Sequence, residues 1–173
     1  ISELAPNLSE LGQGLIAQVK LVKQIAQAID EHGEVMDKAS TKLAGLRNAI
    51  IISKKRLKDK LDSILHDPNN QKYFQETLVT MRGDRYVIPV KMEYKMNFPG
   101  IVHDQSGTGA TLFIEPMAVV NLNNDIKRYT AEEREEVQRI LRTLSQNVGM
   151  EAKDLLLSMN IMTELDVICS QAS

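Results

Sequence analysis

Residues 77–116 read TLVTMRGDRYVIPVKMEYKMNFPGIVHDQSGTGATLFIEP, a pattern that differs from the rest of the chain. β-branched and aromatic residues are separated there by Gly-Asp, Phe-Pro-Gly and Ser-Gly-Thr-Gly, which are turn signals of the kind that join antiparallel strands. On both sides of this stretch, apolar residues recur at the spacing of a helix. The sequence therefore predicts a small antiparallel β element inserted between long helices.

Helical patterns flank this β element. Four segments are expected: one from Asn7 or Ser9 to Ile29, then 40–65, then 116–148, and a fourth that carries apolar residues from Leu155 to Ile168. Gly33 is a natural left-handed residue at the end of the first segment, and Asp37 or Ser40 offers an N-cap for the second. Pro116 suits the first turn of the third segment, because proline has no amide to leave unbonded there. Gly149 is expected to separate the third segment from the fourth.

The second and third segments predict a pair of long helices. Apolar residues of the second recur at strict intervals of seven, at Leu43, Ile50, Leu57 and Ile64. Such a repeat is typical of a coiled-coil seam. Two long helices that enclose one insertion must run in opposite directions if the ends of the insertion lie together. The expected fold class is mainly α with a small antiparallel β insertion: a helical base, a long antiparallel coiled coil and a β tip.

Composition limits the class of protein. The chain has 173 residues, of which 43% are hydrophobic and 25% charged, and a formal net charge of −2, as is usual for a soluble protein. No apolar run approaches the roughly 20 residues that cross a bilayer, and no secretory signal is present, so we expect a cytoplasmic protein without a membrane partner. The single cysteine, Cys169, is expected to be a small buried apolar residue. The abrupt ends at Ile1 and Ser173 suggest a piece of a longer polypeptide.

Several motifs resemble one protein family. They are RYVIPVK (85–91), GIVHDQSGTGATLFIEP (100–116), the pair Asn123-Asn124, the stretch Asp37–Ser40 followed by Leu43 and Arg47, and Glu164-Leu165-Asp166. Together they are similar to the type-two branch of the MutS family, the bacterial paralogues that carry a C-terminal small MutS-related nuclease domain. The resemblance covers nearly the whole chain.

The resemblance implies a core, lever and clamp fragment. By the family pattern, residues 1–39 and 147–173 form the helical core, 40–76 and 117–146 the lever coiled coil, and 77–116 the β clamp. A P-loop ATPase follows the core in that family, but the motif G-x-x-x-x-G-K-S/T does not occur here. The fragment is therefore expected to be non-catalytic, with no catalytic, cofactor or metal residues. ATP, Mg²⁺ and nuclease activity are expected in other domains of the parent.

The resemblance also implies partners. Family members are associated with suppressing recombination by binding branched DNA, and some with rescuing stalled or collided ribosomes. Both targets are rich in phosphate, and the sequence does not choose between them. The full-length protein is expected to be a homodimer, whose second subunit supplies the opposing arm. The alternative function is a structural coiled-coil module whose β tip binds a protein partner.

Four basic residues are candidates for contact with nucleic acid or the ribosome: Arg82, Arg85, Lys91 and Lys95. Against Asp84 and Glu93 they leave a local excess of positive charge, which favours contact with backbone phosphates. Residues 85, 91 and 95 share parity along a regular strand and would project from one face with Val87. The alternative is a solvated sheet edge on which lysines discourage aggregation.

The remaining polar residues of the β element invite a catalytic or metal interpretation, which we consider weaker than a structural one. Adjacent strand residues point to opposite faces, so His103 and Asp104 are not expected to act on one ligand. Gly107-Thr108-Gly109 lacks the following lysine and helix of a phosphate loop, so a tight turn is expected. The residues expected to shape the clamp are Pro89, Gly100, His103, Asp104, Ser106, Gly107, Gly109, Glu115 and Pro116.

The densest basic run lies on the second helical segment. It comprises Lys54, Lys55, Arg56, Lys58 and Lys60, and a solvated helix surface is its expected role, with contact to nucleic acid along the helix as the alternative. The acidic cluster 132–136 could pair with this run across the coil. Folding the chain about the middle of the β element instead places that cluster nearer Arg47.

Overall fold

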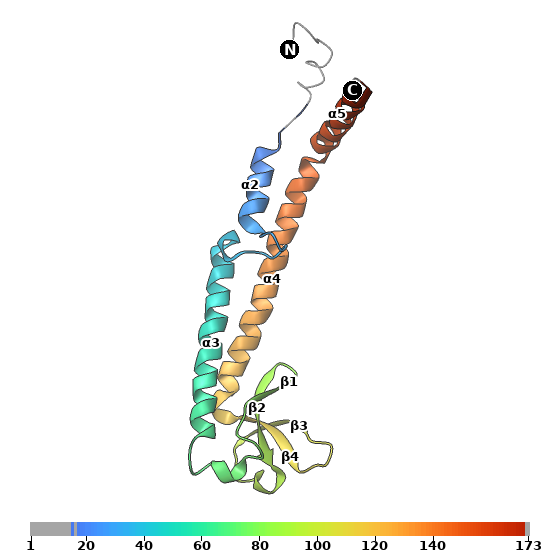
Figure 1. Cartoon of the computed structure of the whole chain (residues 1–173). Helices are drawn as coiled ribbons and strands as arrows, with labels where there is room; N and C mark the ends of the chain where they lie inside the picture. The colour runs from blue at the N-terminus through green and yellow to red at the C-terminus, as the bar shows by residue number, and fades with distance from the viewer. Residues whose placement is uncertain (1–14, 16, 172–173) are drawn as a thin grey trace. The chain divides into compact units, whose positions relative to one another are not determined.

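The computed structural model describes residue 15 and residues 17–171, and it is mainly helical with one small antiparallel sheet (Figure 1). The helices are α2 (Val19–Ala28), α3 (Thr41–Leu65), α4 (Val120–Met150) and α5 (Ala152–Gln171). The strands are β1 (Thr80–Arg82), β2 (Arg85–Lys91), β3 (Gly100–Gln105) and β4 (Thr111–Pro116). The chain forms two compact units: a terminal unit, Ile1–Thr41 with Glu136–Ser173, and a central unit, Lys42–Glu135.

The sheet lies in the central unit. Its strand order is β1-β2-β4-β3, and every neighbouring pair is antiparallel. Gly83, at φ +61°, makes the tight turn between β1 and β2, where a residue with a side chain would be strained. The register of β3 against β4 shifts between Val102 and Asp104, which leaves His103 as the extra residue of a β-bulge. The predicted β element is therefore confirmed as a four-stranded antiparallel sheet.

One apolar core joins this sheet to both helices of the central unit. Its buried members are Leu57, Leu61 and Leu65 of α3, Phe74, Ile88, Val90, Phe98, Leu112 and Ile114 around the sheet, and Val119 and Ile126 at the beginning of α4. Far from the sheet, Arg47 Nε of α3 lies 3.0 Å from Glu133 Oε1 of α4. Because the end of α3 and the beginning of α4 share the core while Arg47 meets Glu133, the two helices run in opposite directions. The placement of the acidic cluster near Arg47 is thereby confirmed.

The terminal unit contains α2, the second part of α4 and α5. Leu21 and Ala28 of α2 and Ile140 of α4 are buried in it. Asn147 Nδ2 of α4 donates a hydrogen bond to Gln24 Oε1 of α2 at 3.3 Å. No helix in the part of the chain that the structure describes is long and apolar enough to cross a bilayer.

The first helical segment differs from expectation within the described residues. The proposed start at Asn7 or Ser9 lies outside the described residues, and the described helix begins only at Val19. It ends at Ala28, because Ile29 is extended and pairs with Val35 in a short bridge. Gly33 does adopt a positive φ, +85°, but within the turn of that bridge rather than at the helix end.

The later helix boundaries and the cysteine also differ from expectation. Pro116 is the last residue of β4, with ψ 138°, and a 3₁₀ turn, Met117–Val119, precedes α4. Gly149 remains inside α4, because a single glycine lowers helix stability by only about 1 kcal/mol; the break follows at Glu151. Cys169 is exposed rather than buried.

Candidate nucleic-acid interface

The sheet has two faces of different character. Ile88 and Val90 of β2 point with Leu112 and Ile114 of β4 into the core. The other face, which we call the outer face, carries the side chains of opposite parity. Paired positions place Arg82 beside Arg85, Pro89 beside Phe113 and Lys91 beside Thr111 on it. The predicted shared face of residues 85, 87 and 91 follows from this register, although Val87 is fully buried rather than projecting into solvent.

A buried carboxylate organises one end of the outer face. Glu115 is 0% exposed, and its Oε1 accepts hydrogen bonds from Arg85 Nη1 at 3.1 Å and Asn123 Nδ2 at 2.8 Å. Its Oε2 lies 2.6 Å from His103 Nε2. Because a buried carboxylate is costly unless charge and hydrogen bonds compensate it, these contacts make Glu115 tolerable in the interior. The described residues contain no buried side-chain polar atom without a partner.

This carboxylate network connects three strands to the first turns of α4. Asn123 is 1% exposed and makes two hydrogen bonds with the backbone of Tyr86. The Tyr86 amide donates to Asn123 Oδ1, and Asn123 Nδ2 donates to the Tyr86 carbonyl, both at 3.2 Å. Arg85 Nη1 also donates to Asn124 Oδ1 at 2.7 Å. The pair Asn123-Asn124 thus fixes α4 against the sheet, a role that the sequence did not indicate.

The β-bulge changes how the polar residues of β3 point. Asp104 pairs with Phe113, and His103 contacts Glu115, so both lie on the outer face. The expectation that adjacent residues 103 and 104 face opposite sides is therefore wrong, because the extra residue resets the alternation. They still have separate partners: Asp104 Oδ2 lies 2.8 Å from Arg82 Nε. No group of three potential metal-ligating side chains occurs among residues 15 and 17–171.

Arg82 and Arg85 are consequently held by acids at this end of the face. The guanidinium carbon of Arg82 lies 3.5 Å from the centre of the Phe113 ring, and the side chain is 33% exposed. Arg85 is 18% exposed and bonded to Glu115. In the turn between β1 and β2, a hydrogen bond from Lys127 at 2.7 Å lowers the pKa of the Asp84 carboxyl below its usual value, so this acid stays ionised. The charges of this end largely compensate one another.

The turn between β3 and β4 is held by local hydrogen bonds. Ser106 Oγ accepts a bond from the Thr111 amide at 3.1 Å, and the Gly109 amide donates to the Ser106 carbonyl at 2.8 Å. Gly109 has φ +76°, which only glycine adopts without strain. Gly100, in contrast, is required for space, because a Cβ there would lie 2.5 Å from the Glu115 carbonyl oxygen. These contacts shape the sheet and leave Gly107 and Thr108 exposed in the turn.

Lysines gather at the opposite end of the outer face. Lys91 lies six residues along β2 from Arg85, or about 20 Å. Its Nζ donates to the Lys72 carbonyl at 3.3 Å. β2 ends at Lys91, and Met92–Tyr94 form a 3₁₀ turn, so the strand parity assumed for Lys95 is wrong and Lys95 follows that turn instead.

We call Lys72, Lys91 and Lys95 the basic corner. An aromatic contact braces it: the rings of Tyr73 and Tyr94 are 5.3 Å apart, so the segments carrying Lys72 and Lys95 lie together. No residue that the structure describes forms an ion pair with any of the three lysines. Lys72 was missed by sequence reasoning because it lies outside the β pattern and reaches the corner only through folding. Unlike the arginine end, the basic corner can offer its charge to an anion.

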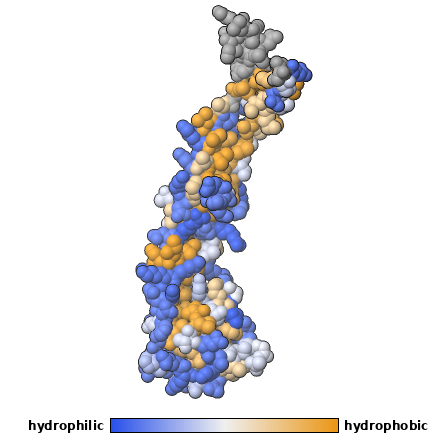
Figure 2. Space-filling view, in the orientation of Figure 1, coloured by the Kyte–Doolittle hydropathy of each residue, from blue (hydrophilic) through white to orange (hydrophobic). Residues whose placement is uncertain are grey.

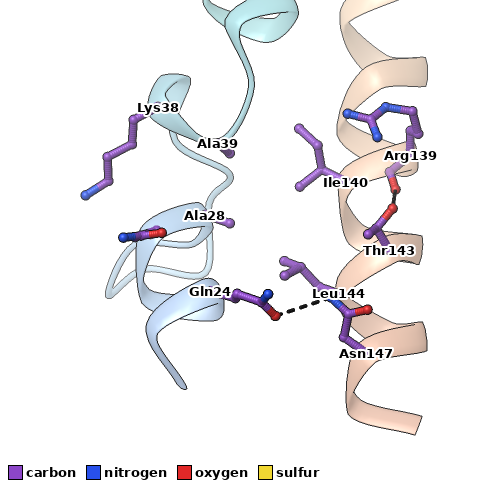
Figure 3. Close-up of a pocket in the computed structure, with 10 residues that line it drawn as sticks. Gln24, Ala28, Lys38, Ala39, Arg139, Ile140, Thr143, Leu144 and Asn147 are labelled. Atoms are coloured by element: carbon purple, nitrogen blue, oxygen red, sulfur yellow. Dashed lines mark hydrogen bonds between the residues drawn. The ribbon is translucent and has the colours of Figure 1, made fainter. Parts of the chain in front are cut away.

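A hollow in the terminal unit is a separate feature. It measures about 290 Å³ and lies between α2 and α4, where Gln24 and Asn147 face each other across a hydrogen bond (Figure 3). Arg139 lines it but donates two hydrogen bonds to the buried carboxylate of Glu136, at 2.7 and 3.0 Å. None of the four basic candidates lines this hollow, so the basic corner remains the candidate interface.

Comparison with known proteins finds similar proteins over nearly the whole length of the chain. No family model matches the chain. A protein named Endonuclease MutS2 from Pelotomaculum thermopropionicum is 45% identical over 170 residues, which is 98% of this chain and 22% of that protein. Endonuclease MutS2 of Shouchella clausii is 48% identical over 87% of the chain and 19% of its own length, and Putative endonuclease MutS2 of Bacillus subtilis is 40% identical over 96% and 21%. The chain thus spans about a fifth of the length of the curated relatives that it matches. The chain is thus similar, over most of its length, to a segment of proteins named Endonuclease MutS2.

Proposed function

We propose that this chain is the lever and clamp region of a MutS-type ATPase and that it grips the phosphate backbone of branched DNA. In this proposal α3 and α4 form the lever coiled coil, within 40–76 and 117–146, and 77–116 is the clamp. Residues 1–39 and 147–173 belong to the core. ATP with Mg²⁺ and the nuclease are in other domains of the longer protein, and a second subunit supplies the opposing arm.

The observation that carries this proposal is that the lysines of the basic corner form no ion pair in the described part of the chain. Lys91 and Lys95 meet no acid among the described residues, whereas Arg82 and Arg85 are bound to Asp104 and Glu115. Lys95 is exposed and Lys91 is half-buried. Lysines without an acid partner can neutralise phosphates and release condensed counterions, which is the main source of sequence-independent affinity for DNA. We therefore assign the main phosphate contact to Lys91 and Lys95. Arg82 and Arg85 act on the same face chiefly by holding the sheet in shape.

The packing supports a mechanical role for the helices. Leu61 and Leu65 of α3 and Ile126 of α4 are buried in the same core as the strands. The Glu115 network adds hydrogen bonds between the strands and α4. Because interiors are close-packed and transmit displacement, a movement of these helices carries the sheet with it. This coupling is what a lever that closes a clamp requires.

The fragment itself is proposed to be non-catalytic. Its expected properties are no ATP turnover and no cleavage of a four-way DNA junction in the presence of Mg²⁺. Turnover by the purified chain that survives a further purification step would contradict the assignment. The alternative, a module that docks a protein through the β tip, differs in its response to salt, because apolar docking weakens little as salt rises.

A charge-reversal experiment tests the grip. The 173-residue chain and the Lys91→Glu/Lys95→Glu variant are titrated against a labelled four-way junction and a matched linear duplex at low salt. Loss of two phosphate contacts and addition of two negative charges are expected to weaken junction binding at least about tenfold. The control is Lys23→Glu, which reverses the charge of an exposed lysine in the terminal unit. This variant is expected to bind the junction as tightly as the unchanged chain does.

Two results would revise the proposal. Equal junction affinity of the double variant and the unchanged chain would remove the basic corner from the interface. Co-sedimentation with purified ribosomes is measured for the same variants. A loss there without a loss on DNA would make the ribosome, rather than branched DNA, the target of the clamp.

A further inference from the structure

Two adjoining hollows lie in the central unit beside β1 and β2, on the face of these strands opposite the outer face. One, of about 540 Å³, lies between α3 and residues 77–81. The other, of about 490 Å³, lies between the β1–β2 hairpin and α4. Both are lined by Lys54, Met81 and Tyr86, so they meet along these side chains. We call the two hollows together the side groove.

The floor of the side groove is aliphatic. Leu57, Leu61 and Leu65 of α3 line its first hollow and are at most 2% exposed. At the lip, Leu78 is 43% and Met81 47% exposed to solvent. A hydrophobic area of the central unit is visible between the helices and the sheet in Figure 2. Large apolar side chains that remain exposed beside a concave aliphatic surface are typical of a protein-binding groove.

The rim of the side groove is basic on its α3 side. Lys54 and Lys58 line it one helical turn apart, and neither has an ion-pair partner in the described part of the chain. They belong to the run 54–60, which holds the cations Lys54, Lys55, Arg56, Lys58 and Lys60 and the single acid Asp59. On the opposite wall Lys127 is paired with Asp84, whereas Arg134 has no described ion-pair partner. The acids Asp62 and Glu135 also line the groove, so the excess of positive charge lies around Lys54 and Lys58.

We propose that the side groove binds an acidic protein segment that carries at least two large apolar side chains. The aliphatic floor accommodates the apolar side chains, and Lys54 and Lys58 attract the carboxylates on either side of them. A nucleic-acid backbone would meet the same lysines but would leave the floor open to water, so the hollow itself favours a protein segment. This inference goes beyond the proposed grip on DNA, because it concerns another face and another class of partner.

The test starts from unbiased peptides. A library of random peptides displayed on phage is selected on the immobilised 173-residue chain, and the enriched peptides are synthesised with a fluorescent label. Their affinity is then measured by anisotropy for the unchanged chain and three variants. Lys54→Glu/Lys58→Glu reverses the rim charge, and Leu78→Asp places a charge at the apolar lip. Lys60→Glu, a single reversal on α3 outside the groove lining, is the control.

The proposal predicts enrichment of peptides that combine Asp or Glu with Leu, Ile or Phe. Their affinity falls about tenfold or more in Lys54→Glu/Lys58→Glu and in Leu78→Asp, and it is unchanged in Lys60→Glu. Far-UV circular dichroism confirms that the variants are folded, and Leu78→Ser replaces Leu78→Asp if the latter is not. Binding of the four-way junction is retained in the Leu78 variant, which separates this site from the basic corner.

Three outcomes would overturn the proposal. The first is a selection without enrichment of acidic and apolar residues. The second is an equal loss of peptide affinity in Lys60→Glu, which would show that only the general charge of α3 matters. The third is displacement of the peptides by a single-stranded DNA oligonucleotide, which would assign the groove to nucleic acid. None of these outcomes depends on whether the basic corner grips DNA.

Discussion

Replacing Glu115 with alanine is expected to lower the free energy of unfolding of the central unit by about 3 kcal/mol. Removing one partner of a buried ion pair costs about 3–5 kcal/mol, because the other charge stays buried without compensation. The low end of that range applies here, because Arg85 is 18% exposed and keeps its hydrogen bond to Asn124. His103 and Asn123 each lose a hydrogen-bond partner as well, so the loss in the free energy of unfolding is not expected to be smaller than about 3 kcal/mol.

The assay uses tyrosine signals, because they report on the central unit alone. The chain has four tyrosines, Tyr73, Tyr86, Tyr94 and Tyr129, all within Lys42–Glu135, and it has no tryptophan. Urea unfolding is followed by near-ultraviolet circular dichroism for Glu115→Ala and for Glu76→Ala. Glu76 is exposed, so its replacement is expected to change stability by at most about 0.5 kcal/mol. A loss below about 1 kcal/mol for Glu115→Ala would refute the reasoning, since the network would then contribute no more than surface contacts.

Three further changes test the packing and the electrostatics. Gly100→Ala is expected to cost about 3 kcal/mol or more by tyrosine-detected unfolding, because the new Cβ meets the rigid backbone of Glu115; a variant as stable as the unchanged chain would contradict that geometry. Leu61→Ala, at a position with 0% exposure, is expected to cost about 2–5 kcal/mol in the same measurement, and a loss under 1 kcal/mol would contradict its place in the core. The ion pair of Asp84 with Lys127 lowers the pKa of the folded-state carboxyl, so its stabilisation is present above the unfolded pKa of about 3.9 and is lost as pH falls through the folded value. Lys127→Ala should therefore be less stable than the unchanged chain at pH 7. The difference in the free energy of unfolding should be under about 1 kcal/mol, because the side chains of Lys127 and Asp84 are both more than half exposed, and it should vanish at low pH.

Local pattern was sufficient to predict the elements of the central unit. Alternating β-branched residues and glycine turns predicted the sheet, and the seven-residue repeat predicted α3 almost to its ends. Folding the chain about the β element predicted the meeting of Arg47 with Glu133. These features depend on side-chain period and on chain connectivity, both of which can be read from sequence.

Features that depend on tertiary contacts were not predicted. The β-bulge at His103 turns two consecutive residues to one face, and no residue type in that stretch specifies such an insertion. Gly149 was expected to end α4, but the helix continues through it because one glycine costs only about 1 kcal/mol.

The candidate interface was predicted only in part. Basic residues on one face of β2 follow from alternation, so the shared face of Arg85 and Lys91 was predicted correctly, although they lie at opposite ends of it. Their different surroundings could not be predicted, because Glu115 reaches Arg85 from another strand, and Lys72 reaches Lys91 from a turn nineteen residues earlier. Charge compensation of this kind is decided by contacts distant in sequence. Such contacts distinguish Arg82 and Arg85, which are paired with acids, from the lysines of the basic corner, which are not.

The salt dependence of binding to a four-way junction tests the central claim most directly. Each lysine that neutralises a backbone phosphate contributes roughly 0.9 to the slope of log affinity against log salt concentration. If Lys91 and Lys95 grip the backbone, the Lys91→Ala/Lys95→Ala variant will have a slope shallower than that of the unchanged chain by about 2. Identical slopes for the two proteins would show that the basic corner does not touch the phosphates, and the clamp would need another surface.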